Sequence, residues 1–126
     1  MATILVIDDN KDLLDMEAEF LNGLGHNVLI AGNGLLGVGL IDENHERLDL
    51  VISDFHLPIL RGYEIAGHVK KQYPHIKVMI QSADTETKQK ALSVGCDAFL
   101  IKPFKVEDFR ELVEKLLGMG SEEETL

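Results

Sequence analysis

Short apolar segments alternate with longer amphipathic segments along the chain. The apolar segments are rich in Val, Ile and Leu, and they cover residues 4–7, 27–31, 48–53, 77–81 and 98–101. Such nearly continuous apolar strands are typical of a parallel sheet that is covered on both faces, whereas the strands of a half-exposed antiparallel sheet alternate between apolar and polar residues. The pattern therefore predicts five buried parallel strands.

Helical patterns lie between and after these strands. The first helix is expected to begin after Asn10, which can cap it, and the last shows an apolar stripe that includes Phe109 and Val113. The second, at about 35–44, contains Gly37 and Gly39, each of which costs roughly 1 kcal/mol relative to Ala. We therefore expect it to be the least stable helix. The alternation of strands and helices predicts an α/β fold of three layers with right-handed crossovers.

Length, charge and cysteine content limit the class of protein. The chain has 126 residues with a formal net charge of −10, and Cys96 is its one cysteine. This length suits one domain, and the negative charge argues against direct binding to nucleic acid or to an anionic membrane. A lone cysteine excludes an internal disulfide framework. With no span long enough for a bilayer and no signal peptide pattern at the start, a cytoplasmic location is expected.

Polar residues stand where the predicted strands end. Asp8 and Asp9 follow the first strand and Asp54 follows the third, while Ser82 and Lys102 follow the fourth and fifth. In an open α/β sheet, ligands bind outside the carboxyl ends of the strands. We therefore expect these five side chains to meet at one edge of the sheet.

The residue types at this edge favour a divalent cation and a phosphoryl group. Three ionised carboxylates and one Lys leave a net charge of about −2, which a packed site tolerates poorly unless a cation or protons bind. Oxygen ligands without His or Cys favour Mg²⁺ over zinc. Lys102 and Ser82 could hold phosphoryl oxygens, as phosphoryl transfer requires. Each Asp alone is more often a turn residue or a helix cap, but their joint placement favours a site.

These motifs resemble the receiver domain of two-component response regulators, over about residues 3 to 117. The matching positions are Asp8-Asp9, the segment from Asp54 to Pro58 with Gly62 after it, Ser82-Ala83, and Gly95 to Phe104. The resemblance implies a flavodoxin-like, doubly wound five-stranded parallel sheet with the strand order 2-1-3-4-5. It also implies a phosphorylation-controlled signalling domain rather than an enzyme.

Roles for individual residues follow from the resemblance. Asp54 is expected to be the phosphoacceptor. Asp9, Asp54 and the backbone carbonyl of His56 are expected to bind Mg²⁺, with Mn²⁺ as a possible substitute and with Asp8 acting mainly through water. Lys102 is expected to pair with Asp54 at rest and with the phosphoryl group afterwards.

The resemblance also implies a conformational switch. Ser82 and the backbone N–H of Ala83 are expected to contact the phosphoryl group, and Phe99 is expected to turn inward into the space that the Ser82 hydroxyl leaves. The Lys102–Pro103 peptide bond is expected to be cis. His56 and Asp84 hold positions that tune the lifetime of the phosphate in the family, although both could be ordinary exposed loop residues.

The expected partners are proteins. A sensor histidine kinase or a histidine phosphotransfer protein is expected to donate the phosphoryl group, and the surface of the fourth helix, fifth strand and fifth helix is expected to contact an unknown downstream protein. Residues 1–118 are expected to form the receiver domain, and 119–126 an acidic tail or the start of a linker. The sequence leaves open whether the chain acts alone or has lost an output domain.

Parts of the sequence also match two other functions. The stretch from Gly32 to Gly37 matches G-x-G-x-x-G and predicts a dinucleotide-binding loop, but a lone motif of this kind is weak evidence. A magnesium-dependent phosphatase of the haloacid dehalogenase type would use a similar set of Asp, Ser and Lys residues. That family, however, begins its site with D-x-D, whereas this chain has adjacent Asp8 and Asp9.

Overall fold

The computed structural model describes residues 1–119 of the chain. Its strands are β1 (Thr3–Ile7), β2 (Asn27–Ala31), β3 (Leu50–Asp54), β4 (Lys77–Ser82) and β5 (Ala98–Ile101). Its helices are α1 (Lys11–Gly23), α2 (Gly34–Asn44), α3 (Gly62–Gln72), α4 (Lys88–Ser93) and α5 (Val106–Leu116), and a short 3₁₀ turn (Thr85–Thr87) precedes α4. Except for Met119, the expected tail lies outside the described residues.

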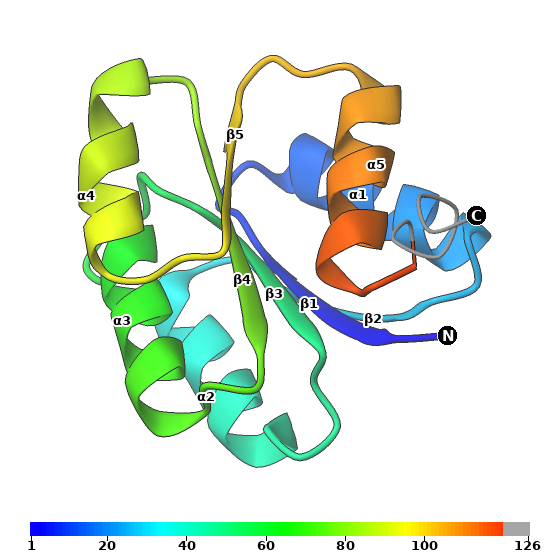
Figure 1. Cartoon of the computed structure of the whole chain (residues 1–126), viewed down its shortest axis with the longest axis horizontal. Helices are drawn as coiled ribbons and strands as arrows, with labels where there is room; N and C mark the ends of the chain where they lie inside the picture. Colours follow the sequence, from blue (N-terminus) through cyan, green and yellow to red (C-terminus); the bar gives the residue numbers. More distant parts are fainter. Residues whose placement is uncertain (120–126) are drawn as a thin grey trace.

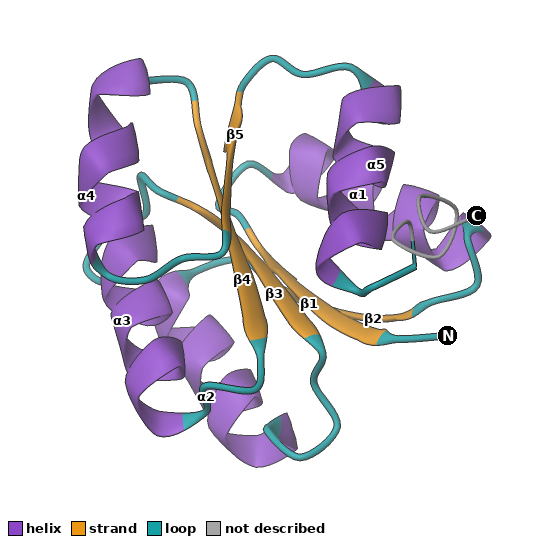
Figure 2. Ribbon diagram, viewed as in Figure 1, coloured by secondary structure: helices purple, strands orange, loops and turns teal. Residues whose placement is uncertain are grey.

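The five strands form one parallel sheet in the order β2-β1-β3-β4-β5. Helices α1 and α5 cover one face of this sheet, and α2, α3 and α4 cover the other (Figures 1 and 2). This is the three-layer, doubly wound α/β fold with the flavodoxin-like order that the sequence and the resemblance predict. The prediction of the fold is confirmed.

Two separate cores flank the sheet, and each strand contributes alternate residues to both. In β1, Ile4 and Val6 pack with Phe109 on the side of α1 and α5, whereas Leu5 and Ile7 pack on the side of α2, α3 and α4. Both faces are therefore apolar, which explains why the strand sequences lack polar alternation.

Three boundaries differ from the sequence prediction. The third strand was expected at 48–53 and runs from Leu50 to Asp54, and β4 continues to Ser82. The fourth helix is short, with six residues, and its Leu92 is 48% exposed. The backbone pairing is the cause in β3 and β4, because parallel register continues to Asp54 opposite Gln81, and to Ser82 opposite Ile101, beyond the apolar run.

The glycines of α2 allow the helix to approach its neighbours closely. A Cβ on Gly34 would lie 2.5 Å from the carbonyl oxygen of Leu60, and a Cβ on Gly37 would lie 2.5 Å from Cδ1 of Ile7 in β1. Gly39 has nothing within 4 Å of its Cβ position. Packing against the protein itself therefore accounts for two glycines of the G-x-G-x-x-G match.

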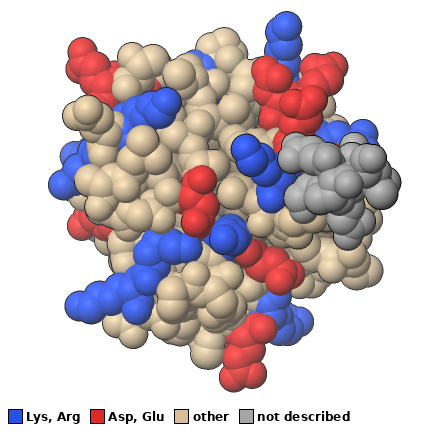
Figure 3. Space-filling model, in the orientation of Figure 1, with Lys and Arg blue, Asp and Glu red and all other residues tan. Residues whose placement is uncertain are grey.

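Charged side chains of both signs are mixed on the face drawn in Figure 3, where Lys and Arg lie among Asp and Glu. Within residues 1–119, no helix combines the length and the apolar character that crossing a membrane requires.

The two helix glycines give opposite predictions for stability. We expect Gly37→Ala to lower the free energy of unfolding by about 1–3 kcal/mol, because its Cβ overpacks Ile7. Gly39→Ala, in the same helix, is expected to raise it by about 0.5–1 kcal/mol, because Ala restricts the unfolded chain and open space surrounds the new methyl group. Urea denaturation of both variants measures the difference, and equal effects would contradict the packing argument.

Candidate functional site

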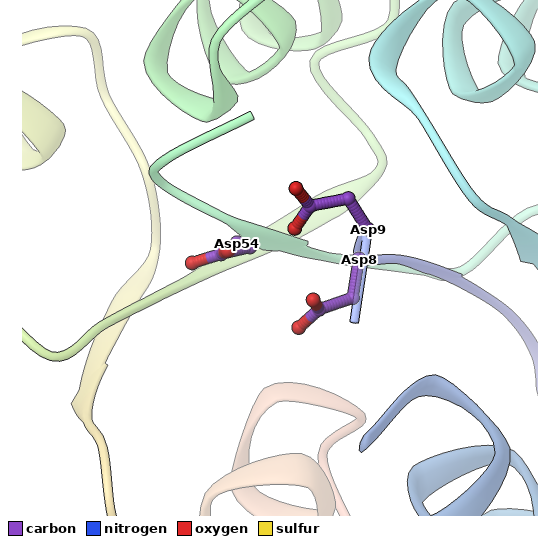
Figure 4. A group of neighbouring side chains, drawn as sticks. All are labelled: Asp8, Asp9 and Asp54. Carbon is purple, nitrogen blue, oxygen red and sulfur yellow. The ribbon is translucent and has the colours of Figure 1, made fainter. Parts of the chain in front are cut away.

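Three carboxylates lie together at the carboxyl ends of the two central strands. Asp8 and Asp9 directly follow β1, and Asp54 is the last residue of β3 (Figure 4). Oxygen atoms from the three carboxylates lie within 4.8 Å of one another. They meet because β1 and β3 are parallel neighbours in register, with Ile7 opposite Ser53. The sequence prediction of an acidic cluster at this edge is confirmed.

Lys102 places one positive charge between two of these acids. Its Nζ lies 3.0 Å from Oδ2 of Asp8 and 3.4 Å from Oδ1 of Asp54. The backbone N–H of Lys102 donates to the carbonyl of Ser82, which continues the β4–β5 ladder into the site. Burial lowers the pKa of Lys102, but its hydrogen bond to Asp8 and the charges of both acids outweigh burial and raise the pKa above its usual value. The ammonium group therefore stays charged at neutral pH.

Asp8 and Asp9 differ in burial and in partners. Asp8 is 1% exposed; its Oδ2 accepts from Lys102, and its Oδ1 accepts the backbone N–H of Asn10. Asp9 is exposed. Asp8 therefore orients Lys102 and the start of α1, while Asp9 offers its carboxylate to the outside.

Burial dominates the titration of Asp54. It raises the pKa of the carboxyl above the usual value, and the charge of Asp8 acts in the same direction. Lys102 and the backbone N–H of His56 partly offset this rise. An additional cation beside Asp54 would favour its ionised form for the same electrostatic reason.

The loop after β3 requires glycine at residue 62. A Cβ on Gly62 would collide with the backbone carbonyl oxygen of Asp54 and would lie 2.9 Å from Cα of Phe55. The N–H of Gly62 also donates to the carbonyl of Phe55. Any larger residue would displace the backbone that carries Asp54, so Gly62 is a determinant of the site's geometry.

Ile59 in the same loop has a left-handed backbone conformation. Its φ is 68°, its side chain is 87% exposed, and the N–H of Leu60 donates to the carbonyl of Pro58 across it at 2.7 Å. A β-branched residue is unfavourable in this conformation. The sequence analysis missed this feature, because nothing in the local pattern distinguishes Ile59 from a regular loop residue.

Ser82 and its neighbours are arranged around the end of β4. The hydroxyl of Ser82 accepts the N–H of Asp84 at 3.1 Å and donates to the Asp84 carbonyl at 3.3 Å. Phe99 in β5 is half-buried against the core on the side of α3 and α4. The Lys102–Pro103 bond is cis, the form that the resemblance implies.

His56 and Asp84 are both exposed loop residues near the site. The His56 ring meets the ring of Phe55 edge-on, with 5.0 Å between centroids. The Asp84 carboxylate accepts the N–H of Glu86 and so caps the 3₁₀ turn. A local structural role therefore accounts for Asp84, and a role in the lifetime of a phosphate stays a prediction for both residues.

A buried polar pair behind the site was also missed. Glu17 of α1 is 0% exposed, and its Oε1 accepts from Nε2 of Gln81 at 3.1 Å. The signal was present, because Glu17 interrupts an apolar face of α1 that includes Leu14 and Leu21. A charged residue on the apolar face of a helix can be interpreted as part of a buried polar contact only when its partner is known, and here the partner is Gln81 of β4.

An apolar pocket of about 360 Å³ adjoins Lys102. Leu13 and Met16 of α1 form one side, and Pro103 and Phe104 form another. Ala83 completes the lining. The pocket therefore combines an apolar lining with the side chain of Lys102.

Comparison with known families identifies this arrangement. The family model described as response regulator receiver domain matches residues 4–114. The chain belongs to the receiver domain family. Receiver domains are signalling domains of two-component systems, and the comparisons support neither a phosphatase nor a dinucleotide-binding protein.

Relatives of this receiver domain include both single-domain and longer proteins. The chain is 30% identical to sporulation initiation phosphotransferase F of Bacillus subtilis, with 94% of this chain and 95% of that protein covered. It is 34% identical to the probable C4-dicarboxylate response regulator DctR of B. subtilis, where 89% of this chain covers 50% of the relative. It covers only 19% of the putative response regulator ARR21 of Arabidopsis thaliana, at 22% identity over 91% of this chain.

Solved receiver structures share the fold closely. A response regulator receiver domain protein from Clostridium thermocellum is 30% identical with a TM-score of 0.88, covering 96% of this chain and 98% of that one. The response regulator TrrA from Thermotoga maritima, solved in complex with Mg²⁺-BeF, is 29% identical with a TM-score of 0.85. That alignment covers 93% of this chain and all of TrrA (100%).

Removing the charge of Lys102 is expected to destabilise the protein without added metal. Lys102→Ala leaves Asp8 and Asp54 buried without their shared cation and should lower the free energy of unfolding by about 3 kcal/mol. Lys11→Ala is the control, because Lys11 pairs with Asp15 at 2.8 Å but is exposed, so its removal should leave stability close to that of the original protein. Chemical denaturation in EDTA tests both, and a neutral Lys102→Ala would contradict the electrostatic account.

Relieving the backbone at Ile59 is expected to stabilise the protein. Ile59→Asn should raise the free energy of unfolding by about 1 kcal/mol, because Asn tolerates a positive φ better than a β-branched residue does. Ile59→Val keeps the branch at Cβ and should leave stability unchanged. Thermal denaturation of both variants provides the measurement, and a gain with Val as large as that with Asn would refute the explanation.

Proposed function

We propose that Asp54 accepts a phosphoryl group from a phosphohistidine on a sensor histidine kinase or a histidine phosphotransfer protein. The observation that carries this proposal is the cluster of three carboxylates with Lys102 at 3.0 and 3.4 Å from two of them. Among these acids, Asp54 is the last residue of the central strand β3 and contacts Lys102. Its side chain is 12% exposed. It is therefore accessible to a donor and close to a fixed positive charge.

The donor set fits a hard divalent cation, Mg²⁺ or in its place Mn²⁺. Asp9 and Asp54 would hold it together with the backbone carbonyl of His56, while Asp8, with both oxygens already bonded, would act mainly through water. Oxygen-only ligands and excess negative charge support this assignment. The complex of TrrA with Mg²⁺-BeF, a relative of the same fold, also supports it. When bound, the cation supplies positive charge beside the phosphoryl oxygens.

In the transfer step, a carboxylate oxygen of Asp54 attacks the phosphorus, a P–O bond forms, and the P–N bond to the donor histidine breaks. The histidine nitrogen keeps the electron pair of that bond. Lys102 stabilises the negative charge on the transferred oxygens, which lies close to its Nζ once the group is on Asp54. Water later hydrolyses the aspartyl phosphate.

Ser82, Ala83 and Phe99 are proposed to convert phosphorylation into a change of shape. The Ser82 hydroxyl would leave its two bonds to the Asp84 backbone and, with the N–H of Ala83, bind the phosphoryl group. Phe99 would then turn into the vacated space. The phosphate favours whichever of two conformers offers it better contacts.

The readout surface is proposed to be formed by α4, β5 and α5. Each element exposes an aliphatic side chain there: Leu92 at 48%, Ile101 at 44% and Val106 at 46%. Exposed aliphatic residues on adjacent elements support a protein partner. A cytoplasmic location is proposed because the chain has one cysteine, the buried Cys96, and therefore no internal disulfide.

Substitution of Asp54 tests the assignment directly. Asp54→Asn is expected to abolish labelling by acetyl phosphate in Mg²⁺, because the amide lacks the nucleophilic carboxylate oxygen. Asp12→Asn, an exposed acid in the first turn of α1, is the control and should label like the original protein. Intact-mass spectrometry measures the added phosphoryl group, and EDTA should suppress it. Undiminished labelling of Asp54→Asn would refute the proposal.

A further inference from the structure

Glu17 is a buried acid that the proposed transfer reaction does not use. It projects from α1 toward the sheet and is 0% exposed. One carboxyl oxygen, Oε1, accepts the amide N–H of Gln81 at 3.1 Å, and the other, Oε2, has no hydrogen-bond partner among residues 1–119. An ionised carboxylate without exposure to water requires more than one neutral donor.

The position of Gln81 places this acid behind the phosphoacceptor. Gln81 lies directly opposite Asp54 in the register of β3 and β4, and its carbonyl accepts the N–H of Phe55 at 2.7 Å. The next residue in β4 is Ser82. A charge on Glu17 therefore interacts electrostatically with Asp8, Asp54 and Lys102 at the ends of the neighbouring strands.

The groups around Glu17 do not provide a cation of its own. Asp8 from the end of β1, Asp54 from β3 and Lys102 from the end of β5 are the charged groups that act on it. Lys102 already bonds to both of these acids. Strand β4 presents Gln81 and Met79, and α5 faces this side of the sheet with the uncharged Phe109 and Val113.

We propose that Glu17 holds a proton in the metal-free protein and releases it when a divalent cation binds at Asp9 and Asp54, so that cation binding and the ionisation of Glu17 are linked. This inference rests on the metal site proposed above. When the cation binds, the O–H bond of the Glu17 carboxyl group breaks. Its electron pair stays on the carboxylate oxygen, and the proton goes to solvent. By reciprocity, the cation binds more tightly when Glu17 is ionised.

The groups around Glu17 determine how the affinity for Mg²⁺ should change with pH, and over which pH range. Burial, in first place, and the negative charges of Asp8 and Asp54 raise the pKa of Glu17 to about 7, against the opposing effect of Gln81 and Lys102. The added charge of a bound cation lowers it. If this lowering is about one pKa unit, apparent Mg²⁺ affinity increases about fivefold from pH 6 to pH 8, and about half a proton is released per ion near pH 6.5.

Isothermal titration calorimetry with Mg²⁺ tests the linkage without any phosphoryl donor. Titrations at pH 6.5 in two buffers with different ionisation enthalpies give the number of protons released per ion. The original protein is expected to release about half a proton more than Glu17→Gln, whose amide cannot ionise. Glu19→Gln, an exposed Glu of the same helix, is the control and should behave like the original protein.

Infrared spectroscopy gives a second readout that requires no substitution. The metal-free protein with ¹³C-labelled glutamate should show the carbonyl stretch of a protonated glutamic acid at pH 6.5, and this band should weaken when Mg²⁺ is added. The labelled band distinguishes Glu17 from the aspartates of the site. This readout stays decisive if Glu17→Gln fails to fold.

The outcomes separate this inference from the metal site itself. Tight Mg²⁺ binding with equal proton release in the original protein and Glu17→Gln would overturn the linkage alone. Absence of the protonated glutamate band in the metal-free protein would do the same. Absence of Mg²⁺ binding in the original protein, measured up to high concentration, would overturn both the metal site and the linkage.

Discussion

An excess of negative charge at the ends of β1 and β3, with Asp8 fully buried, is the constraint on which the rest of this molecule depends. Asp8, Asp9 and Asp54 bring their carboxylates within 4.8 Å of one another, and Lys102 is the cation beside them. One ammonium group cannot neutralise three carboxylates. The site therefore favours whatever adds positive charge or removes negative charge, which includes divalent cations and protons. Its chemistry follows from this imbalance.

The fold holds that imbalance in place through backbone pairing. Parallel neighbours end at the same edge of a sheet, so residues far apart in the chain meet there because of register. Close packing supports the arrangement: Gly62 lies against the backbone of Asp54, and Gly37 lets α2 reach Ile7 of β1. A methyl group at residue 62 would collide with the backbone that carries Asp54, whereas one at residue 37 would displace the Ile7 side chain at the end of β1.

The parts that the sequence predicted are those with local signals. Continuous apolar strands, the cap at Asn10 and the polar residues at strand ends depend on short segments, and the structure contains all of them. The roles of Asp54, Ser82 and Phe99 came from the resemblance, because no local pattern distinguishes a phosphoacceptor from a turn residue. The bounds of β3 and the end of β4 were wrong, since hydrogen-bond pairing rather than apolar content decides them.

The features that escaped prediction depend on contacts between distant segments. Glu17 and Gln81 become a pair only when α1 packs on β4, 64 residues apart in the chain. Ile59 has a positive φ in the same loop in which Gly62 packs against the backbone of Asp54, although its residue type disfavours that conformation. Neither the Glu17–Gln81 pair nor the backbone conformation of Ile59 can be predicted from the residues adjacent to it in the sequence.

Strand β4 connects the two sides of the site. Gln81 binds the buried acid behind Asp54, and the next residue, Ser82, has a hydroxyl that bonds to the loop after the strand. Under the two proposals above, a change in charge at Asp54 would act on two consecutive residues of β4: on Gln81 through the proton of Glu17, and on Ser82 through its hydroxyl. Strand β4 also pairs with β5, where Phe99 lies opposite Ile80 and the exposed Ile101 lies opposite Ser82. Ser82 therefore links the acidic site by direct strand pairing to β5, one of the three elements of the proposed readout surface.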